Sequence, residues 1–488
     1  MGKTERSFKL LVASIVIFTG ISMGAFHVQA NGQAPSYNYS YWGGDSISAP
    51  DAYKPTTLVN GEDLGIGPFI EPSDIHVTED QMIYVVDSGN NRVVMLNHRF
   101  QLIDTVASFD NNGKKDQLSN PQGIFVTKEK QIFIADTGNN RIVQLDQNYQ
   151  LVTIIEQPSS DLLKDDFVFQ PLRVVVDNAG RVYTMAEGVF DGFMEFNVNG
   201  EFNTFIGANR VQVDPIELLW KRLSTQAQRS QMVMFIPTEF TNLDINEEGF
   251  IYATNGDNSS DKIKKLNARG TDILRREGYF DPIGDIRYPI DIGPSRLIDI
   301  DVSDSEMYSV LDSKRGRIFT YNNDGHLMYV FGGIGNRRGL FHTPVAIERV
   351  SEQFLVLDKA LGEITVFKAT NYGHMINQAV RSYYEGDEES AYHFFKEVIE
   401  MNANLEFAYA GIGKALLRQG DYKGGAMENF KKSLDQKNYS KAFLLYRKEV
   451  LKDYFPTILT TILVAVIGLF VWRFYRKLIK RRKEITIE

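Results

Sequence analysis

The stretch "DSGNNRVVMLN" (residues 87–97) returns 49 residues later as "DTGNNRIVQLD" (residues 136–146). Repetition at such a period is typical of architectures in which similar units stack, because one unit alone cannot bury its apolar face. The similarity extends over residues 72–106 and 121–155, where runs of alternating apolar residues are separated by acidic, Gly-rich and Asn-rich turns. Each copy is therefore predicted to form four short antiparallel strands.

Four weaker copies follow, so the chain contains six units; the weaker ones span residues 171–207, 240–274, 297–331 and 344–368. The sixth copy has room for only three strands before the pattern becomes helical. An orphan strand, "TTLVN" (residues 56–60), precedes the first unit. We expect this strand to complete the sixth unit and close a ring, which protects strand edges from aggregation.

The repeated phrase has the chemistry of a tight turn. Gly and Asn accept positive φ angles, and an Asp side chain accepts hydrogen bonds from turn amides. The Asp-x-Gly-Asn-Asn-Arg pattern resembles the NHL-repeat family, and the resemblance, over residues 53–368, implies an all-β six-bladed propeller. It is specific in the first two units and looser later, at Ala186, Asn255 and Glu363. The turn is expected to shape the blades, with Arg92, Arg141, Arg317 and Lys262 pairing with an Asp of their own or a neighbouring unit.

The amino terminus has the pattern of an export signal. Three basic residues precede an apolar run at 10–26, and the small-residue motif "VQA" occupies 28–30. Residues 1–30 are therefore predicted to be a signal peptide cleaved after Ala30, with an uncleaved anchor as the alternative, and residues 31–52 a linker.

A second apolar run lies near the carboxyl terminus. Residues 454–472 contain no charge, and 19 residues suffice to cross about 30 Å of hydrocarbon. Seven basic residues follow within 473–483. We predict a transmembrane helix at 455–472, a basic cytoplasmic tail at 473–488 and an ectodomain outside a bacterial cell. The net charge of −9 and the adjacent apolar run argue against nucleic-acid binding, and the absence of cysteine excludes thiol chemistry and disulfides.

Between propeller and span, residues 374–454 change to helical periodicity. Two helix pairs are predicted at 376–403 and 408–436, and their turn glycines, Gly386 and Gly420, lie 34 residues apart. This spacing resembles tetratricopeptide repeats; the matching positions are Ala391, Phe395, Tyr409, Gly413, Phe430 and Leu434. The second unit has one extra residue before Ala426, and residues 439–454 are predicted to form a capping helix. The resemblance implies binding of a peptide or partner helix, and a stiff spacer is the alternative.

An insertion interrupts the repeats between units three and four. Residues 214–230 have the capping box and apolar stripe of an amphipathic helix, with Trp220 on that stripe. Such a helix can cover the channel, dock a partner through Trp220, or pack on the propeller flank.

The innermost strands supply the best candidate site, because they converge on the axis of the ring. One face of these strands is apolar, and the other carries polar groups; the candidate ligand-binding channel consists of Asp74, His76, Arg173, Asn242, Asp244, Asp299 and Asp301. The alternative is that these groups bond to backbone amides of neighbouring blades or to channel water.

Two enzymatic hypotheses can be compared with this set. Sugar lactonases on related six-bladed folds hold a divalent metal through Glu, Asn and Asp oxygens, and by position Asp74, Asn242 and Asp299 would be the ligands. A zinc-dependent lyase with three channel histidines is disfavoured, because only His76 lies on an inner strand. No G-x-S-x-G, phosphate-binding Gly-rich or H-E-x-x-H motif occurs.

The sequence therefore favours a non-enzymatic role. We predict a membrane-anchored extracellular binding or scaffold protein, whose propeller recognises a ligand and whose helical repeats hold a membrane partner such as a transporter or glycan-handling complex. No cofactor is expected under this hypothesis. The alternative is a metal-dependent hydrolase of the sugar-lactonase type, which would require a divalent cation in the channel.

Overall fold

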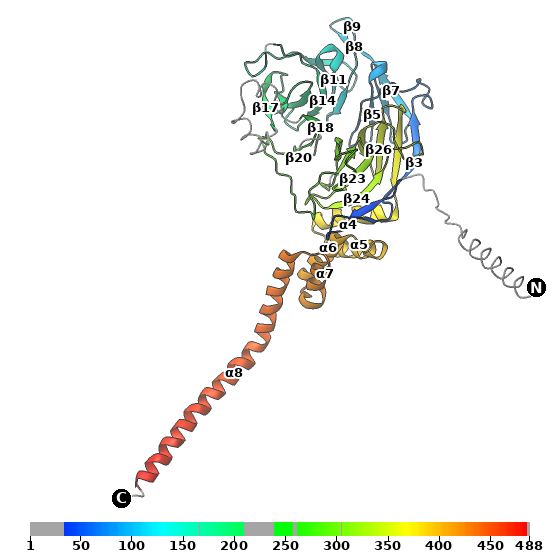
Figure 1. Ribbon diagram of the computed structural model, residues 1–488. Coiled ribbons are helices and arrows are strands. Elements are labelled where there is room, and N and C mark those ends of the chain that lie inside the picture. The colour runs from blue at the N-terminus through cyan, green and yellow to red at the C-terminus, as the bar shows by residue number, and fades with distance from the viewer. Residues whose placement is uncertain (1–33, 165, 209–238, 257–260, 304, 486–488) are drawn as a thin grey trace, which may run out of the picture.

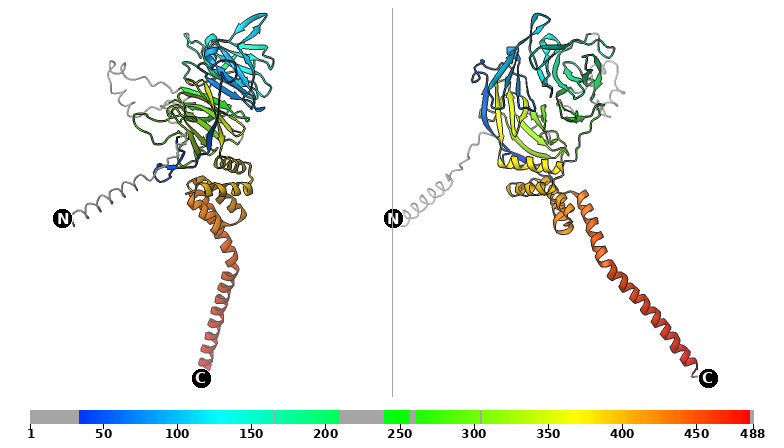
Figure 2. Two further views of the ribbon diagram at one scale, coloured as in Figure 1. Left: turned by 90° about the vertical axis from the view of Figure 1, so that its right-hand side faces the viewer. Right: turned by 180° about the vertical axis from the view of Figure 1, so that it is seen from behind.

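The computed structural model describes residues 34–485, apart from residues 165, 209–238, 257–260 and 304. Six antiparallel sheets stand around one axis, and their first strands contact one another in the closed order β4, β10, β14, β18, β21, β25 and back to β4. A helical region follows the ring and ends in one long helix (Figures 1 and 2). The predicted six-bladed propeller with a carboxyl-terminal helical region is confirmed.

The blades follow the repeats. Blade one contains β4 (Asp74–Val77), β5 (Ile83–Asp87), β6 (Arg92–Leu96) and β7 (Leu102–Val106), with the 3₁₀ turn η1 (Ser88–Asn90). Blade two contains β10 (Gly123–Val126), β11 (Ile132–Asp136), β12 (Arg141–Leu145) and β13 (Leu151–Ile155), with η2 (Thr137–Asn139). Blade three contains β14 (Pro171–Val176), β15 (Val182–Ala186), β16 (Phe193–Phe196) and β17 (Phe202–Ile206). Blade five contains β21 (Leu297–Val302), β22 (Tyr308–Asp312), β23 (Arg317–Tyr321) and β24 (Leu327–Gly332).

The orphan strand closes the ring as predicted. Blade six combines β25 (Pro344–Val350), β26 (Gln353–Asp358) and β27 (Glu363–Ala369) with β3 (Tyr53–Asn60), which precedes the first blade in sequence. β3 pairs antiparallel with β27 from Asn60 opposite Glu363 to Tyr53 opposite Ala369. The closing strand is therefore three residues longer than the segment 56–60 that its composition indicated.

Blade four departs from the prediction of four strands. Its sheet has three, β18 (Phe240–Ile245), β19 (Ile251–Asn255) and β20 (Ile263–Leu266), and only an isolated bridge joins Leu266 to Asp272. The outer edge of β20 is occupied by side chains. The Asp272 carboxylate accepts from the Lys265 backbone N–H at 3.2 Å, and the Arg276 guanidinium donates to the Ile263 carbonyl at 3.0 Å. Because these groups satisfy part of the exposed edge, the blade does not need a fourth strand there.

The repeated turn ties each blade to the chain that enters it. Oδ1 of Asp87 accepts from the Ile70 backbone N–H at 2.7 Å, and its Oδ2 accepts from Asn90 and from Nε of Arg92 at 2.8 and 2.7 Å. The side chain of Asp87 is fully buried, and Asn91 ends the turn at φ 52°.

Blade two repeats this geometry. Asp136 accepts from the Ser119 backbone N–H at 2.7 Å, from Asn139 at 2.9 Å and from Nε of Arg141 at 2.8 Å. Arg141 also makes a 2.8 Å ion pair with Asp116. The recurring phrase is thus a structural anchor, in which a buried carboxylate holds both its own turn and the preceding inter-blade loop.

In blade five the predicted pairing of Arg317 is wrong. The Arg317 guanidinium donates to the Gly332 carbonyl at 2.8 Å, while Arg315 lies 3.3 Å from the turn carboxylate of Asp312. The three-residue segment after the aspartate places a different arginine beside it. In blade four the ammonium of Lys262 donates to the Ser295 carbonyl.

Two hairpins decorate the ring. β8 (Ser108–Asn111) and β9 (Lys114–Gln117) project between blades one and two (Figure 1). β1 (Tyr37–Tyr39) and β2 (Ser46–Ser48) lie in the segment predicted to be a linker. This amino-terminal hairpin is packed rather than free, because Asn38 bonds to Asn402 of the helical region at 3.0 Å and its own Nδ2 donates to the Met328 carbonyl.

The helical region begins directly after the last blade. Its elements are α4 (Asn371–Glu385), α5 (Glu388–Met401), α6 (Glu406–Gln419), the π-helical turn η3 (Tyr422–Ala426), α7 (Met427–Lys432) and α8 (Gln436–Ile485). Thr370 caps α4 and Asp387 caps α5 through their side-chain oxygens, while Gly386 and Gly420 end α4 and α6 in left-handed conformations.

Close helix packing explains the glycines of α6. A Cβ at Gly411 would lie 2.3 Å from the Phe395 ring, and one at Gly413 would lie 2.8 Å from the Phe430 ring. The π-helical turn η3 precedes α7 and takes up the extra residue noted before Ala426. Leu434 lies in the turn after α7, with φ 57°, rather than in the helix.

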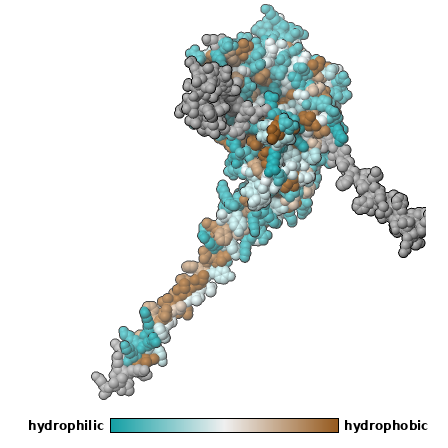
Figure 3. Space-filling view, in the orientation of Figure 1, coloured by the Kyte–Doolittle hydropathy of each residue, from teal (hydrophilic) through white to brown (hydrophobic). Residues whose placement is uncertain are grey.

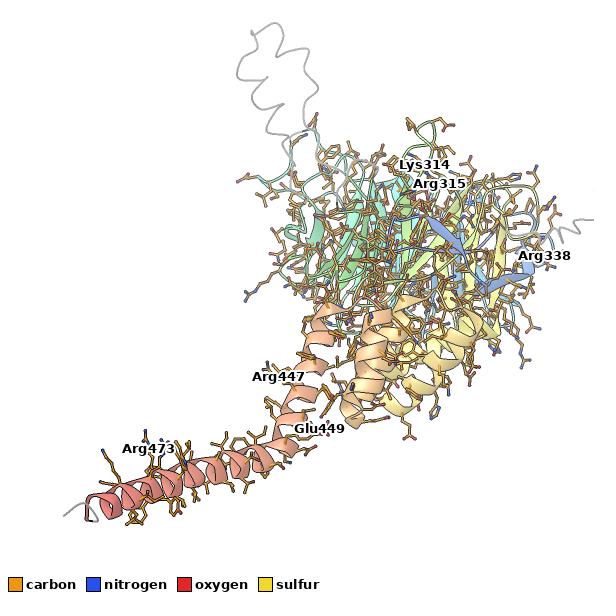
Figure 4. The ribbon with its side chains drawn as sticks, turned by 60° about the horizontal axis from the view of Figure 1, so that its bottom comes forward. Lys314, Arg315, Arg338, Arg447, Glu449 and Arg473 are labelled. Atoms are coloured by element: carbon orange, nitrogen blue, oxygen red, sulfur yellow. The ribbon has the colours of Figure 1, made fainter. Side chains whose placement is uncertain are left out.

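The predicted capping helix and span form one continuous helix with the basic residues that follow, as far as Ile485. α8 has 50 residues, which corresponds to about 75 Å at 1.5 Å per residue, and contains Pro456. Its apolar stretch is long enough to cross a membrane. Figure 3 shows this stretch as a brown band between hydrophilic ends, and in Figure 4 Arg447 and Glu449 lie on the side of the helical region and Arg473 towards the far end.

The propeller and the helices share one core. Ile376 and Val380 of α4 and Phe407 of α6 belong to the same buried cluster as Phe331 and Phe354 of blades five and six. One face of α4, and α6 at Phe407, therefore pack against the propeller, so the helical region forms a base for the ring.

One histidine at this junction gives a pH prediction. His326 packs between the rings of Tyr279 and Phe407, at 5.2 and 4.9 Å, and its buried Nδ1 has no hydrogen-bond partner among the described residues. Burial lowers its pKa to about 4; the nearby Lys414 charge acts in the same direction, and the charges of Asp324 and Asp435 partly oppose it. The histidine of the unfolded chain has a pKa of about 6.5, so between pH 6.5 and 4 the unfolded chain binds a proton at His326 and the folded chain does not.

The free energy of unfolding is therefore expected to fall as pH drops from 6.5 towards 4, by roughly 2–3 kcal/mol from this group. His326→Phe should flatten the decline in denaturant titrations at several pH values. His393→Phe, at an exposed position on α5, is the matched control and should leave the decline unchanged. Equal slopes in wild type and His326→Phe would contradict the assignment.

Candidate functional site

The six innermost strands place two rings of side chains around the axis. Their pairing registers align them, so that the first ring consists of Asp74, Gly123, Arg173, Asn242, Asp299 and Ala346. Two residues further along each strand, the second ring consists of His76, Phe125, Val175, Asp244, Asp301 and Glu348. All seven residues predicted from the sequence lie in these rings.

In the first ring, acidic groups join neighbouring blades. Oδ2 of Asp74 accepts from the Ile124 backbone N–H of blade two at 3.0 Å. Oδ2 of Asp299 accepts from the Ile347 N–H of blade six at 2.5 Å, and its Oδ1 accepts from its neighbour Ile300 at 2.9 Å. These side chains therefore serve as inter-blade latches.

Asn242 and Arg173 complete the first ring. The Asn242 amide donates to Oδ1 of Asp299, and its own oxygen accepts from Leu243 at 2.7 Å. The Arg173 guanidinium donates to backbone carbonyls of three blades, including Ser73 at 3.0 Å, and its Nε lies 3.8 Å from Asp74. The remaining space at this level is about 20 Å³, which suits a single water molecule.

The second ring is less completely paired with backbone. Asp244 continues the latch pattern, because its Oδ2 accepts from Val302 of blade five at 3.0 Å. Asp301 lies 3.3 Å from the Arg349 guanidinium, and Nδ1 of His76 lies 3.4 Å from Glu348. The side chains of His76 and Glu348 keep 14% and 18% of their surface exposed, so this ring is open to solvent.

Crowding of acids dominates the electrostatics. Burial, followed by the charges of Glu348 and Asp301, raises the pKa of Asp244 well above its usual range. Burial, followed by Asp301 and Asp74, does the same to the pKa of Glu348. Burial also raises the pKa of Asp299 and lowers that of His76. The second ring is thus a site where additional positive charge would be stabilising.

The proposed metal ligands do not present a free set of oxygens. Both carboxylate oxygens of Asp299 and the amide oxygen of Asn242 accept hydrogen bonds, and one oxygen of Asp74 does so. Within the described residues, no group of three or more His, Asp or Glu side chains is arranged to hold a metal ion. As they stand, the three residues fit a structural role better than metal coordination.

Beyond the second ring the channel widens into a cavity of about 580 Å³, which we call the vestibule. Its walls are the second ring and the loops that follow β4, β10, β14, β18 and β21. Of the described residues that line it, ten are Asp or Glu and two are Lys. An adjoining cavity of about 420 Å³ extends from the same loops to α4, where Asn377 and Arg381 line it. The volume is in the range of pockets that enclose small ligands.

Sequence reasoning missed Glu348, which faces the channel from blade six, and its neighbour Arg349, which pairs with Asp301. The register of β25 with β26 puts Glu348 in the column of Asp244 and Asp301, so an alignment of all six first strands would have found it. The predicted docking residue Trp220, with its helix at 214–230, lies outside the described residues, as does the predicted signal peptide.

Distant structural likenesses to this chain exist among known proteins. No protein-family model and no curated protein matches the chain in sequence. Among solved structures, virginiamycin B lyase from Staphylococcus aureus is similar at 10% identity and TM-score 0.41, over 65% of this chain and 100% of the lyase. A putative gluconolactonase is similar at 11% identity and TM-score 0.40, over 66% and 94% of the two chains. A Bacteroides thetaiotaomicron protein of unknown function is similar at 13% identity and TM-score 0.43, over 67% and 80%. These likenesses concern the fold alone.

Proposed function

We propose that this chain is a membrane-anchored binding protein whose propeller recognises a ligand in the vestibule. The observation that carries the proposal is the division of the channel. The first ring is filled by inter-blade hydrogen bonds, whereas the second ring opens into a cavity of about 580 Å³ with polar and aromatic walls. We also infer that the blades are of the NHL type and that the helix pairs are tetratricopeptide-like, because the anchoring turn and the close packing at Gly411 and Gly413 support those resemblances.

The helical base suits the role of a rigid mount. Its α4 and α6 faces are buried against the propeller, so a membrane partner, such as a transporter-associated complex, would meet the outward surface of α8. Phe443, Leu444 and Leu451 on α8 are each 43–53% exposed above the apolar stretch. Co-purification from detergent tests whether a partner binds this surface of α8. Recovery of the same proteins with a Phe443→Ser, Leu444→Ser, Leu451→Ser variant would contradict binding there.

In the orientation that we propose, the propeller lies outside the cell and the carboxyl end in the cytoplasm. The support is the apolar stretch of α8, followed by basic residues that include Arg473, Arg476, Lys477 and Lys480. With a carboxyl-terminal epitope tag, protease added to intact cells should degrade the propeller and leave the tag protected. A tag that is digested without permeabilisation would contradict the orientation.

Ligand recognition is tested on the full chain in detergent. A library of neutral, anionic and cationic small molecules should include compounds that raise the melting temperature by several degrees, because a ligand bound only to the folded state stabilises it. Asn178→Trp, at an exposed rim position of the vestibule, should abolish those shifts by placing a bulky ring across the entrance. Shifts that survive this substitution, or a library without any binder, would sink the proposal.

Metal-dependent hydrolysis is the alternative function, and it predicts that a divalent metal raises the melting temperature of the protein. The binding-protein proposal predicts no rise, because oxygens of Asp299 and Asn242 already accept hydrogen bonds from the protein. Replacing EDTA by calcium, magnesium, manganese or zinc should then shift the melting temperature by less than about 1 °C. Asp299→Ala should instead lower the free energy of unfolding by about 2–3 kcal/mol without metal, since it removes the acceptor of the Ile347 and Ile300 backbone N–H groups and of the Asn242 amide. A metal-induced rise of several degrees that Asp299→Ala abolishes would favour the hydrolase.

A further inference from the structure

The chain places an ammonium group of its own over the vestibule. Nζ of Lys128, on the loop after β10, lies 2.6 Å from Oε1 of Glu79 and 3.5 Å from Oε1 of Glu247. Glu79 follows β4 of blade one, and Glu247 follows β18 of blade four. In a ring of six these blades stand opposite each other, so the lysine side chain bridges the mouth.

The bridge is weakly held. The side chains of Lys128, Glu79 and Glu247 are 48%, 59% and 60% exposed, and ion pairs this exposed contribute only about 0–1 kcal/mol. The neighbouring Lys130 is used differently, because it pairs at 2.8 Å with Asp80 on the adjacent blade. Lys128 is thus a tethered cation that a ligand can displace at little cost.

The vestibule wall below Lys128 also favours a positively charged group. Asp244, Asp301 and Glu348 converge in the second ring, and their mutual repulsion is only partly offset by Arg349. The rings of His76 and Phe125 pack 4.9 Å apart on the same wall and offer an aromatic surface to an alkyl chain or a cation. Carboxylates, aromatic faces and a cavity of this size together fit a cationic organic molecule.

Resting on the proposed ligand-binding function, we propose that the vestibule is a site for an alkylammonium ligand, and that Lys128 occupies its outer position until that ligand arrives. The ammonium of the ligand would take the place of the Lys128 ammonium between Glu79 and Glu247 and extend towards Glu348. A free polyamine and a lysine side chain of a peptide share this chemistry.

The test uses the full chain in detergent, with isothermal titration of spermidine, of a short lysine-rich peptide, and of 1,5-pentanediol and glutarate as neutral and anionic comparisons. Spermidine or the peptide should bind, with affinity that falls as salt rises, and the two comparisons should not. Binding of only one of the two amines identifies the source. Equal binding of pentanediol would overturn the inference while leaving a ligand-binding function intact, whereas failure of every compound class in the broader library would overturn that function itself.

Variants separate displacement from general electrostatics. Lys128→Met removes the competing ammonium and should tighten amine binding about two- to fivefold. Glu348→Gln should weaken amine binding about tenfold, because it removes a carboxylate towards which the ligand extends. It should not lower the stability of the protein, because it relieves repulsion among the acids of the second ring. The matched control is Lys359→Met, which breaks an exposed pair with Glu71 at the turn end of blade six and should change affinity less than twofold. An unchanged or weaker affinity in Lys128→Met, or an equal gain in Lys359→Met, would overturn the displacement model.

Discussion

Replacing Tyr53 by alanine is expected to lower the free energy of unfolding by about 4 kcal/mol, because it removes a large, fully buried aromatic side chain. Tyr53 begins the closing strand β3 and is fully buried. Its ring lies 5.4, 5.0 and 4.8 Å from the rings of Tyr329, Phe331 and Phe354, and its hydroxyl accepts from Asn377 of α4 at 2.8 Å. One side chain therefore supports both the closure of the ring and its attachment to the helical base.

The measurement is denaturant unfolding in detergent, combined with limited proteolysis. Tyr53→Ala should open a cleavage site near the start of α4 because the helix loses its contact with the closing strand. Tyr53→Phe keeps the ring stack and removes only the hydrogen bond, so its cost should be about 1 kcal/mol. A cost for Tyr53→Ala as small as that of Tyr53→Phe would show that the closing strand contributes little to the core.

The ring itself was predictable because its signal is repeated. Two clearly similar copies indicated the strand pattern, and the missing strand of the sixth unit together with the orphan at 56–60 indicated the closure. Alternation along each first strand also specified which residues face the axis, because strand side chains alternate between faces. Asp74, Asn242 and Asp299 lie where that argument put them.

The hydrogen-bond partners of those residues were less predictable from the sequence. Alternation gives the face of a side chain, but the partner of a carboxylate depends on the offset between blades, which brings Ile124 to Asp74 and Ile347 to Asp299. The Lys128 bridge depends on how far a loop leans over the mouth, which strand periodicity does not encode. Glu348 could have been predicted from the sequence. It was missed because the first strand of the sixth unit was not aligned with those of the other five.

The structure differs from the sequence prediction at the outer strand of blade four and within α8, and both differences have physical reasons. Residues 267–274 have the composition of an outer strand, yet the side chains of Asp272 and Arg276 satisfy the edge of β20 and the chain turns away. In α8, changes of composition suggested three segments. Backbone hydrogen bonding continues through such changes, so the structure has a single helix from Gln436 to Ile485.

Asp87→Ala is expected to be the most damaging change in the repeated turn, at about 4 kcal/mol, and more damaging than Asp136→Ala, at about 3 kcal/mol. Both carboxylates are fully buried and accept from a loop amide, an asparagine and an arginine. The difference lies in the arginines. Arg141 keeps a second carboxylate, Asp116, at 2.8 Å, whereas Arg92 is left with carbonyl oxygens of the loop, including that of Ile66 at 2.8 Å.

A double-mutant cycle isolates this difference. Asp136→Ala with Asp116→Ala should cost more than the sum of the single substitutions, because only the double variant leaves the Arg141 charge without a carboxylate. In blade one, Asp87→Ala with Arg92→Ala should cost less than the sum, because removing both partners leaves no uncompensated charge. Denaturant unfolding of the four single and two double variants measures both couplings. Strict additivity in both blades would mean that the turn carboxylates and the arginines stabilise the propeller independently, and that the ion pair between them contributes nothing to the fold.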